Sequence, residues 1–342
     1  MKLYSCCFSE CELHSQITAQ SQGNKDYCKY NNGHISEYVD LDEFRDLFIS
    51  FFSLFDKDAD NCCIDLLSII ERDWKLLNSE LSQKRQFLDE LLTELKIDMS
   101  SSSLVAYKEE IISCITSWER VKESLQERRR YFPEYTPEDE GWGNLLDCQI
   151  TLEKGYLYRA RINPRDRQDS PLSAEEMGPP EKNIAVAGRA NPQGIPFLYL
   201  CRDEKTTAYE TRALLLDRIS VGCFQIERPL KIVNFCAKFD PFIAESYDGM
   251  STIAKQTLLF REIANDMSRP IRRHSSQIEY IPTQYICEYI RHIIGADGVQ
   301  FKSSIRESGE NIVLFNNLDK VKCTHVKLYE IRKNKIEWDN LL

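Results

Sequence analysis

The sequence predicts an α+β protein in which an N-terminal α-helical bundle precedes a mixed α+β domain. Two observations support this fold class. The longest helical stretch, around residues 62–97, keeps an apolar period of 3.6 residues and contains neither Pro nor Gly. From about residue 150, apolar residues instead form short strand-like runs such as GYLYRARI and LKIVNF, separated by helical stretches. A chain of 342 residues is long enough for about two such domains.

The first half begins with a polar, Cys-bearing leader over residues 1–35. Apolar residues at helical spacing then predict three helices that pack as a bundle over residues 36–131; they cover about 41–55, 62–97 and 104–131. The serine-rich MSSSS segment separates the second helix from the third and supplies a cap.

The second half begins after a segment with two Pro, two Gly and several acidic residues, which predicts a linker or arm over 132–149. Alternating strands and helices then predict one mixed domain over 150–320. The tail at 321–342 contains THVKLYEIRKNKIEW, which predicts a closing strand.

Charge and composition narrow the classes of partner. The net charge is −10; residues 1–150 hold 16 basic and 29 acidic residues, and the rest of the chain holds 28 and 25. An acidic front half lacks the clustered cations that nucleic acids require, so no nucleic-acid partner is expected. No apolar run approaches the roughly 20 residues of a membrane helix, and the N-terminus lacks a signal-peptide core. We therefore expect a cytoplasmic protein without a membrane anchor, whose 13 cysteines are reduced thiols.

Four residues of the second half suggest a nucleotide site. Arg159 lies on a predicted strand, Arg189 in a Gly- and Pro-containing loop, Tyr199 on the next strand and Glu210 on a helix. Two guanidinium groups suit a pyrophosphate, a tyrosine can stack on a flat ring, and a carboxylate can stabilise a cationic sugar carbon. The alternative is structural, with Tyr199 in the core and Arg189 paired to Glu210.

The order of several motifs resembles the RES domain. The matching pieces are LYRAR, GR-x-N-P-x-G-I-P-x-LY, TTAYE, YIPTQ, and DGVQFKSS followed by GENIVLF, over roughly residues 150–317. Ala190 departs from the pattern, because an aromatic residue often follows the GR pair. The resemblance implies catalytic roles for Arg159, Glu210 and Tyr199. It also implies substrate-binding roles for Arg189 and Ser303, with Ser304 as the alternative serine.

The resemblance to RES proteins also implies a fold and a function. The fold is similar to that of ADP-ribosyltransferases, and the activity is that of an NAD+-degrading toxin or defence effector. Such an enzyme cleaves the nicotinamide–ribose bond by hydrolysis or phosphorolysis; the alternative is an ADP-ribosyltransferase that modifies a protein or another macromolecule. NAD+ is then a substrate and no cofactor is expected, in keeping with the absence of a G-x-G-x-x-G fingerprint. An antitoxin or other regulatory protein is the implied partner, and a homo-oligomer is left open.

The leader resembles a cysteine knuckle found at the start of a helical extension on some larger RES proteins. Tyr4 and Lys25 stand where that pattern has cysteines before Cys7 and Cys28. Structural zinc prefers two closely spaced pairs of Cys or His ligands. We therefore expect no metal site.

Overall fold

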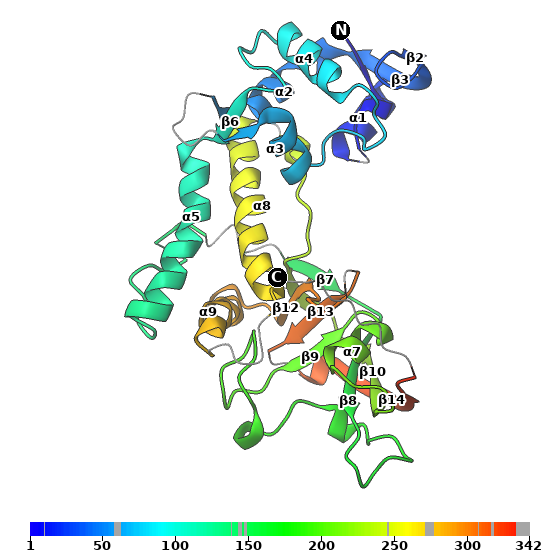
Figure 1. Ribbon diagram of the computed structural model, residues 1–342, viewed down its shortest axis with the longest axis vertical. Coiled ribbons are helices and arrows are strands. Elements are labelled where there is room, and N and C mark those ends of the chain that lie inside the picture. The colour runs from blue at the N-terminus through cyan, green and yellow to red at the C-terminus, as the bar shows by residue number, and fades with distance from the viewer. Residues whose placement is uncertain are drawn as a thin grey trace, which may run out of the picture. The chain divides into compact units, whose positions relative to one another are not determined.

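The computed structural model describes residues 1–9, 11–57, 63–137, 139–142, 146, 149–244, 246–270, 277–306, 308–315 and 318–332. The chain divides into two units. The first contains Met1–Thr116 and Lys238–Leu259, and the second contains Ser117–Ala237 and Phe260–Leu342. Both divisions fall inside helices, α5 (Glu109–Glu123) and α8 (Tyr247–Ser268), which appear as continuous ribbons in Figure 1.

The first unit combines short helices with two small antiparallel sheets. One sheet has the order β1-β3-β2 and the other β4-β6-β5. The strands are β1 (Lys2–Tyr4), β2 (Lys25–Cys28), β3 (His34–Asp40), β4 (Phe55–Asp56), β5 (Ile64–Asp65) and β6 (Leu104–Tyr107). The helices, besides those shared with the second unit, are α1 (Glu12–Gln20), α2 (Arg45–Phe52), α3 (Leu66–Asp73) and α4 (Lys84–Glu94).

This unit differs from the predicted bundle of three long helices. The helix expected over 62–97 is two helices, α3 and α4, and the start of the helix expected at 104 is strand β6. Helix α3 ends at Asp73 with Trp74 as its C-cap, and Lys75 then adopts a φ of 49°. The Trp74 indole donates a hydrogen bond of 3.0 Å to the Tyr107 hydroxyl of β6, so tertiary contacts override the local helical period here.

The core of the first unit is rich in aromatic side chains and includes a segment from the second half of the sequence. Phe242 packs against Phe51 and Phe48 with ring centroids 5.1 and 5.7 Å apart. Residues 238–259 therefore complete this core. The division between the two units falls between Thr116 and Ser117, inside α5, and not at the predicted linker over 132–149. The core of the first unit also takes residues from both halves of the sequence.

The second unit is built on one mixed sheet, which confirms the α+β class. Within the described residues the strand order is β14-β10-β8-β9-β13-β12-β11-β7, and every pair is antiparallel except β11 with β12. The strands are β7 (Gln149–Leu152), β8 (Tyr156–Ile162), β9 (Leu198–Cys201), β10 (Arg218–Ile226), β11 (Leu230–Asn234), β12 (Gly298–Lys302), β13 (Glu310–Leu314) and β14 (Val321–Glu330).

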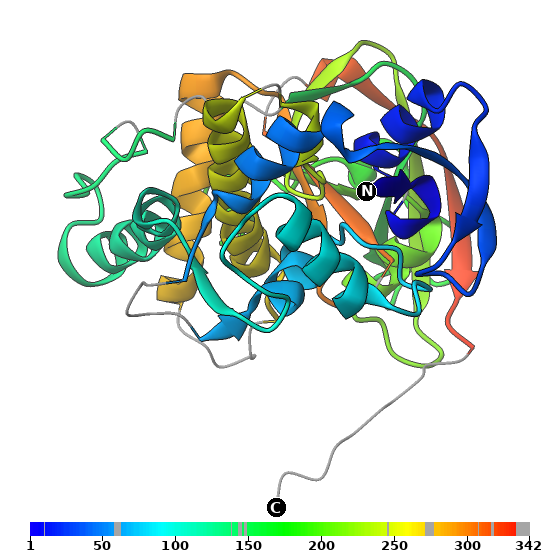
Figure 2. The same cartoon turned by 90° about the horizontal axis from the view of Figure 1, so that it is seen from above.

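The two faces of this sheet have different neighbours. One face carries an apolar cluster that includes Leu157, Leu200 and Ile312. The other face is covered by α7 (Glu204–Glu210) over β8 and β9. Helix α9 (Ile281–Tyr289) lies beside the C-terminal part of α8 in both views (Figures 1 and 2). No helix in the described part of the chain is long and apolar enough to cross a membrane.

Candidate active site

A hydrogen-bonded carboxylate lies at the C-terminal end of α7. Glu210 Oε1 accepts a hydrogen bond of 2.6 Å from the Ser303 hydroxyl and one of 2.8 Å from the Asn311 amide. Asn311 belongs to β13, where it pairs with Cys201 of β9 on the face under α7. Glu210 is half-buried, so its carboxylate is both oriented by the protein and within reach of solvent.

The conformation of the loop after β12 determines that Ser303, and not Ser304, forms a hydrogen bond with this carboxylate. The Ser303 backbone N–H donates to Gly309 O at 2.8 Å, and its hydroxyl oxygen accepts from Ile305 N and Arg306 N, both at 3.2 Å. These bonds fix the Ser303 side chain and direct its hydroxyl hydrogen to Glu210. Ser304 is half-buried and lies outside this cluster.

The same loop is tied to the start of α7. The Asp203 side chain caps the helix by accepting from Thr206 N at 3.0 Å. Arg306 forms an ion pair with Asp203 and donates to Thr206 Oγ1 at 2.7 Å. A Cβ atom on Gly309 would lie 2.8 Å from Thr206 Oγ1, so this position requires glycine. Both ends of α7 are thus fastened to the loop that carries Ser303.

A second group of contacts shapes the loop that carries Arg189. Gly188 N donates to Asn191 O at 2.9 Å, and the Tyr199 hydroxyl donates to Asn191 Oδ1 at 2.7 Å and accepts from Ala190 N at 3.2 Å. A Cβ atom on Gly188 would lie 2.6 Å from the Tyr199 hydroxyl. The Tyr199 hydroxyl is therefore bonded to the backbone and side chain of the loop.

Helix α9 holds this loop from the other side. Gln284 Nε2 donates to Gly188 O at 2.8 Å and to Asn191 O at 3.0 Å, and Thr283 Oγ1 donates to Arg189 O at 2.7 Å. Thr283 and Gln284 are the last two residues of the YIPTQ motif. That motif thus has a structural explanation, because it fixes the backbone around Arg189.

The Arg189 side chain is linked electrostatically to the carboxylate. Its Nη1 donates to Asp266 O at 3.3 Å. Burial lowers the pKa of Arg189, and the nearby Tyr280, Glu210 and Tyr199 oppose that shift. Arg189 and Glu210 therefore lie within electrostatic range, without an ion pair between them in the described structure.

Arg159 lies elsewhere on the sheet. It pairs with Gly222 of β10, and strand alternation places it on the same face as Leu157. Its neighbour Tyr158 pairs with Cys201 on the opposite face, under α7. Arg159 directly follows the one residue pair that joins β8 to β9 in the described structure, and it forms no hydrogen bond with Glu210, Ser303 or Asn311; its charge lies within electrostatic range of Tyr199.

The guanidinium of Arg159 is nonetheless unusual. Its Nη1 atom is buried and has no hydrogen-bond partner among the residues that the structure describes. Burial, together with the charge of Arg161, lowers the pKa of Arg159 to about 10, and Tyr199 opposes the shift. Arg161 has a buried Nε without such a partner as well, but its Nη2 donates to Gly178 O at 2.6 Å. Arg159 is a cation whose surroundings leave a donor available for an anionic ligand.

The sequence analysis did not identify Asn311 as a site residue, although Asn311 lies in the motif GENIVLF. A polar residue in an otherwise apolar strand was the available signal. Asp203 and Arg306 were also missed, because their contact joins residues 103 positions apart.

We expect Tyr199→Phe to lower the free energy of unfolding by about 1–3 kcal/mol, because the loss of one hydroxyl leaves Asn191 Oδ1 and Ala190 N without their partner. Denaturant unfolding of both proteins measures the difference. Tyr156→Phe is the matched control, since this tyrosine is 53% exposed on the neighbouring strand and its change should be near zero. Equal effects of the two substitutions would contradict the assignment of the hydroxyl to the loop.

A family profile described as the RES domain matches residues 156–338. No curated protein matches the chain. Among solved structures, the crystal structure of the M. tuberculosis MbcT-MbcA toxin-antitoxin complex contains a chain with 13% sequence identity and a TM-score of 0.33, over 57% of this chain and 93% of that chain. Since the profile covers more than half of its residues, the chain belongs to the RES-domain family.

Proposed function

We propose that the second unit is an NAD+-degrading enzyme that cleaves the bond between nicotinamide and ribose. The observation that carries the proposal is the carboxylate of Glu210, which is oriented by Ser303 and Asn311 through its Oε1 atom alone. No residue that the structure describes donates to Oε2, so this oxygen is available to a ligand. A fixed, half-buried carboxylate suits a reaction that develops positive charge on a sugar carbon.

In the proposed reaction, water or inorganic phosphate attacks the anomeric carbon of the nicotinamide-bearing ribose. The C–N bond breaks, its electron pair stays with nicotinamide, and nicotinamide leaves as a neutral molecule. Water yields ADP-ribose and a proton, whereas phosphate yields a phosphate ester of ADP-ribose. The transition state resembles an oxocarbenium ion, whose charge Glu210 offsets.

The other residues have supporting roles in this proposal. Arg189 and Arg159 bind the pyrophosphate, and the unpartnered Nη1 of Arg159 supplies one donor. Tyr199 acts as a positioning residue through the loop that carries Arg189. Ser303 orients Glu210 and lies close enough to contact the same substrate.

The direct test is a product assay on the purified full chain with NAD+. Free nicotinamide and ADP-ribose in phosphate-free buffer support hydrolysis. Release that requires added phosphate, with an ADP-ribose phosphate detected by mass spectrometry, supports phosphorolysis. Transfer of ADP-ribose from labelled NAD+ to macromolecules of a cell extract would instead support the alternative, a transferase. No nicotinamide under any of these conditions would refute the proposal.

The toxin role is part of the same proposal and has its own readout. Expression of the chain should deplete cellular NAD+ and arrest growth, and Glu210→Gln should do neither. A protein antitoxin would be recognised as a partner whose co-expression restores NAD+. Growth arrest with normal NAD+ would separate toxicity from the proposed chemistry.

Ser303→Ala should lower turnover roughly 10–100-fold, because Glu210 loses one of the two donors that orient it, and a hydrogen bond to a charged group contributes about 1.5–3 kcal/mol. Ser304→Ala is the matched control on the adjacent residue and should keep nearly full turnover. Steady-state kinetics of both variants provides the measurement. The reverse ranking would assign the serine of the motif to position 304.

A further inference from the structure

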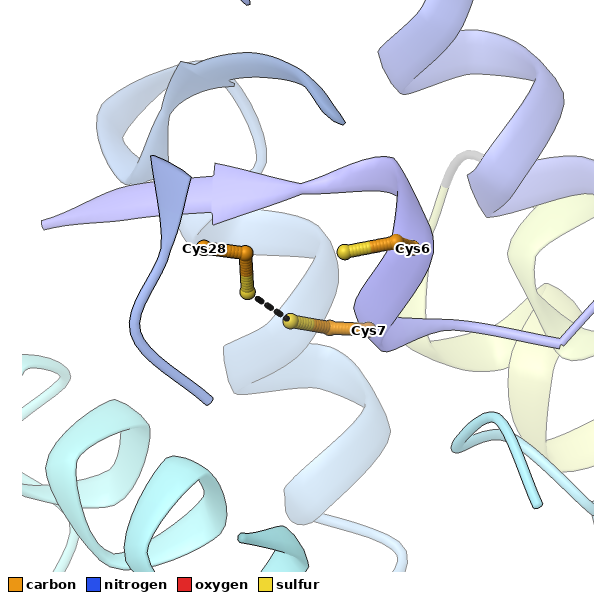
Figure 3. A group of neighbouring side chains, drawn as sticks. All are labelled: Cys6, Cys7 and Cys28. Atoms are coloured by element: carbon orange, nitrogen blue, oxygen red, sulfur yellow. Dashed lines mark hydrogen bonds between the residues drawn. The ribbon is translucent and has the colours of Figure 1, made fainter. Parts of the chain in front are cut away.

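Three cysteines of the first unit meet at one point. Cys6 and Cys7 lie in the short 3-10 helix that follows β1, and Cys28 is the last residue of β2. Their Sγ atoms all lie within 4.8 Å of one another, and those of Cys7 and Cys28 are 3.5 Å apart. Figure 3 shows the three side chains pointing toward one another. All three are free thiols.

These spacings fit a shared metal ion. Tetrahedral zinc binds sulfur at about 2.3 Å, which separates its sulfur ligands by roughly 3.8 Å. The backbone around the cluster is already fixed, because Tyr4 pairs with Tyr38 of β3, and Cys28 pairs with His34 at the other end of the same strand. Small rotations of the thiol side chains therefore suffice to place three sulfurs around one ion.

A polar group also holds the backbone next to the sulfurs. The Cys6 backbone N–H donates to Ser36 Oγ at 3.1 Å, and this hydroxyl lies 2.8 Å from the Ser5 hydroxyl. Hydrogen bonds around a metal site that fix the ligand residues help to orient the ligands.

We propose that Cys6, Cys7 and Cys28 bind one thiophilic metal ion of the zinc class through three thiolates. The sequence argued against a metal because Tyr4 and Lys25 occupy knuckle positions, which leaves Cys28 without a closely spaced second ligand. The structure brings in Cys6, the direct neighbour of Cys7, as a third sulfur. Within the described residues no other Cys, His, Asp or Glu joins the group, so a small molecule such as water would complete the coordination.

The test uses the full chain, purified without added metal and kept reduced with a phosphine that does not chelate. Co2+ is titrated as a spectroscopic probe, followed by Zn2+. We expect one Co2+ per chain, sulfur-to-metal charge-transfer absorption typical of three thiolates, and displacement by one equivalent of Zn2+. Zn2+ should also raise the unfolding temperature and protect three cysteines from alkylation, as read by mass spectrometry.

Variants separate this site from unspecific thiol binding. Cys6→Ser should weaken Zn2+ binding by more than about 100-fold, since loss of even an outer-shell partner costs roughly 10–100-fold. Cys11→Ser is the matched control, because Cys11 is a partly buried cysteine of the same unit outside the cluster, and its variant should bind normally. Circular dichroism checks that both variants fold.

Three results would overturn the proposal. One is the absence of stoichiometric Co2+ and Zn2+ binding by the reduced wild-type chain. The second is normal binding by a folded Cys6→Ser variant. The third is a Cys7–Cys28 disulfide that forms readily and excludes the metal, which would identify the cluster as a redox element. Because the alkylation measurement uses the wild-type chain, the proposal remains testable even if a variant fails to fold.

Discussion

Glu210→Gln should reduce NAD+ turnover by roughly 10²–10³-fold while NAD+ binding persists. The substitution keeps the shape of the side chain and removes its charge, so the developing oxocarbenium ion loses its counter-charge; losing one preorganised electrostatic group typically has an effect of this size. The amide oxygen can still accept from Ser303 and Asn311, so the local structure should remain. Release of nicotinamide measures turnover, and calorimetry measures binding.

Glu204→Gln provides the control for this experiment. Glu204 lies in the first turn of the same helix and pairs with Lys327 of the edge strand at 3.4 Å, away from Ser303. Its variant should turn over NAD+ at nearly the normal rate. If Glu210→Gln retained near-normal turnover in a folded protein, the carboxylate would have no part in the chemistry.

Arg159→Met should weaken NAD+ binding by roughly 10–100-fold without destabilising the free protein. A charged hydrogen bond to a phosphate contributes about 1.5–3 kcal/mol, which corresponds to that range of affinity. The free protein has no bond from Nη1 to lose, and a buried cation without a partner is itself unfavourable. Binding is best measured in the Glu210→Gln background, where NAD+ is not consumed, and stability by thermal unfolding.

Arg161→Met is the informative comparison, because Arg161 lies two residues along the same strand and donates to Gly178 O. Its replacement should lower stability and leave NAD+ affinity largely unchanged. If the Arg159→Met variant were instead less stable than the wild type and bound NAD+ normally, Arg159 would have a structural role. The pyrophosphate would then bind at another place.

The order of the motifs predicted the family, but the residues that meet in space were only partly predictable. Glu210 and Ser303 were named from their motifs, whereas Asn311 emerged only when β13 was paired with β9. The adjacent serines at 303 and 304 differ by one position in the sequence, and the hydrogen bonds of Ser303 in the folded loop distinguish them. Arg159 was named as part of the same site as Glu210, and this assignment stays a prediction, because β8 and β9 share only the Tyr158–Cys201 pair in the described structure and Arg159 lies just beyond it.

The predicted helix over 62–97 shows where local periodicity misleads. Between α3 and α4 the backbone bonds to the leader, because Ser9 N donates to Leu76 O at 2.9 Å and Asn78 N donates to Cys7 O at 3.0 Å. These partners are roughly 70 residues away in sequence, and no window of 18 residues contains them. An apolar period of 3.6 residues indicates which residues of a segment are buried, but it does not indicate which other parts of the chain bury them.

The discontinuous first unit has a consequence for synthesis of the chain. Its core needs Phe242, which is translated long after Phe48 and Phe51 have left the ribosome. Phe242 follows these two residues by about 190 positions, and at roughly 5–20 residues per second this delay lasts about 10–40 seconds. During that interval the nascent N-terminal segment carries an aromatic surface that its own residues cannot cover. A ribosome that stalls before residue 242 would therefore release a fragment prone to aggregation, and pausing or chaperone capture in this window would govern how much of the chain reaches its native state.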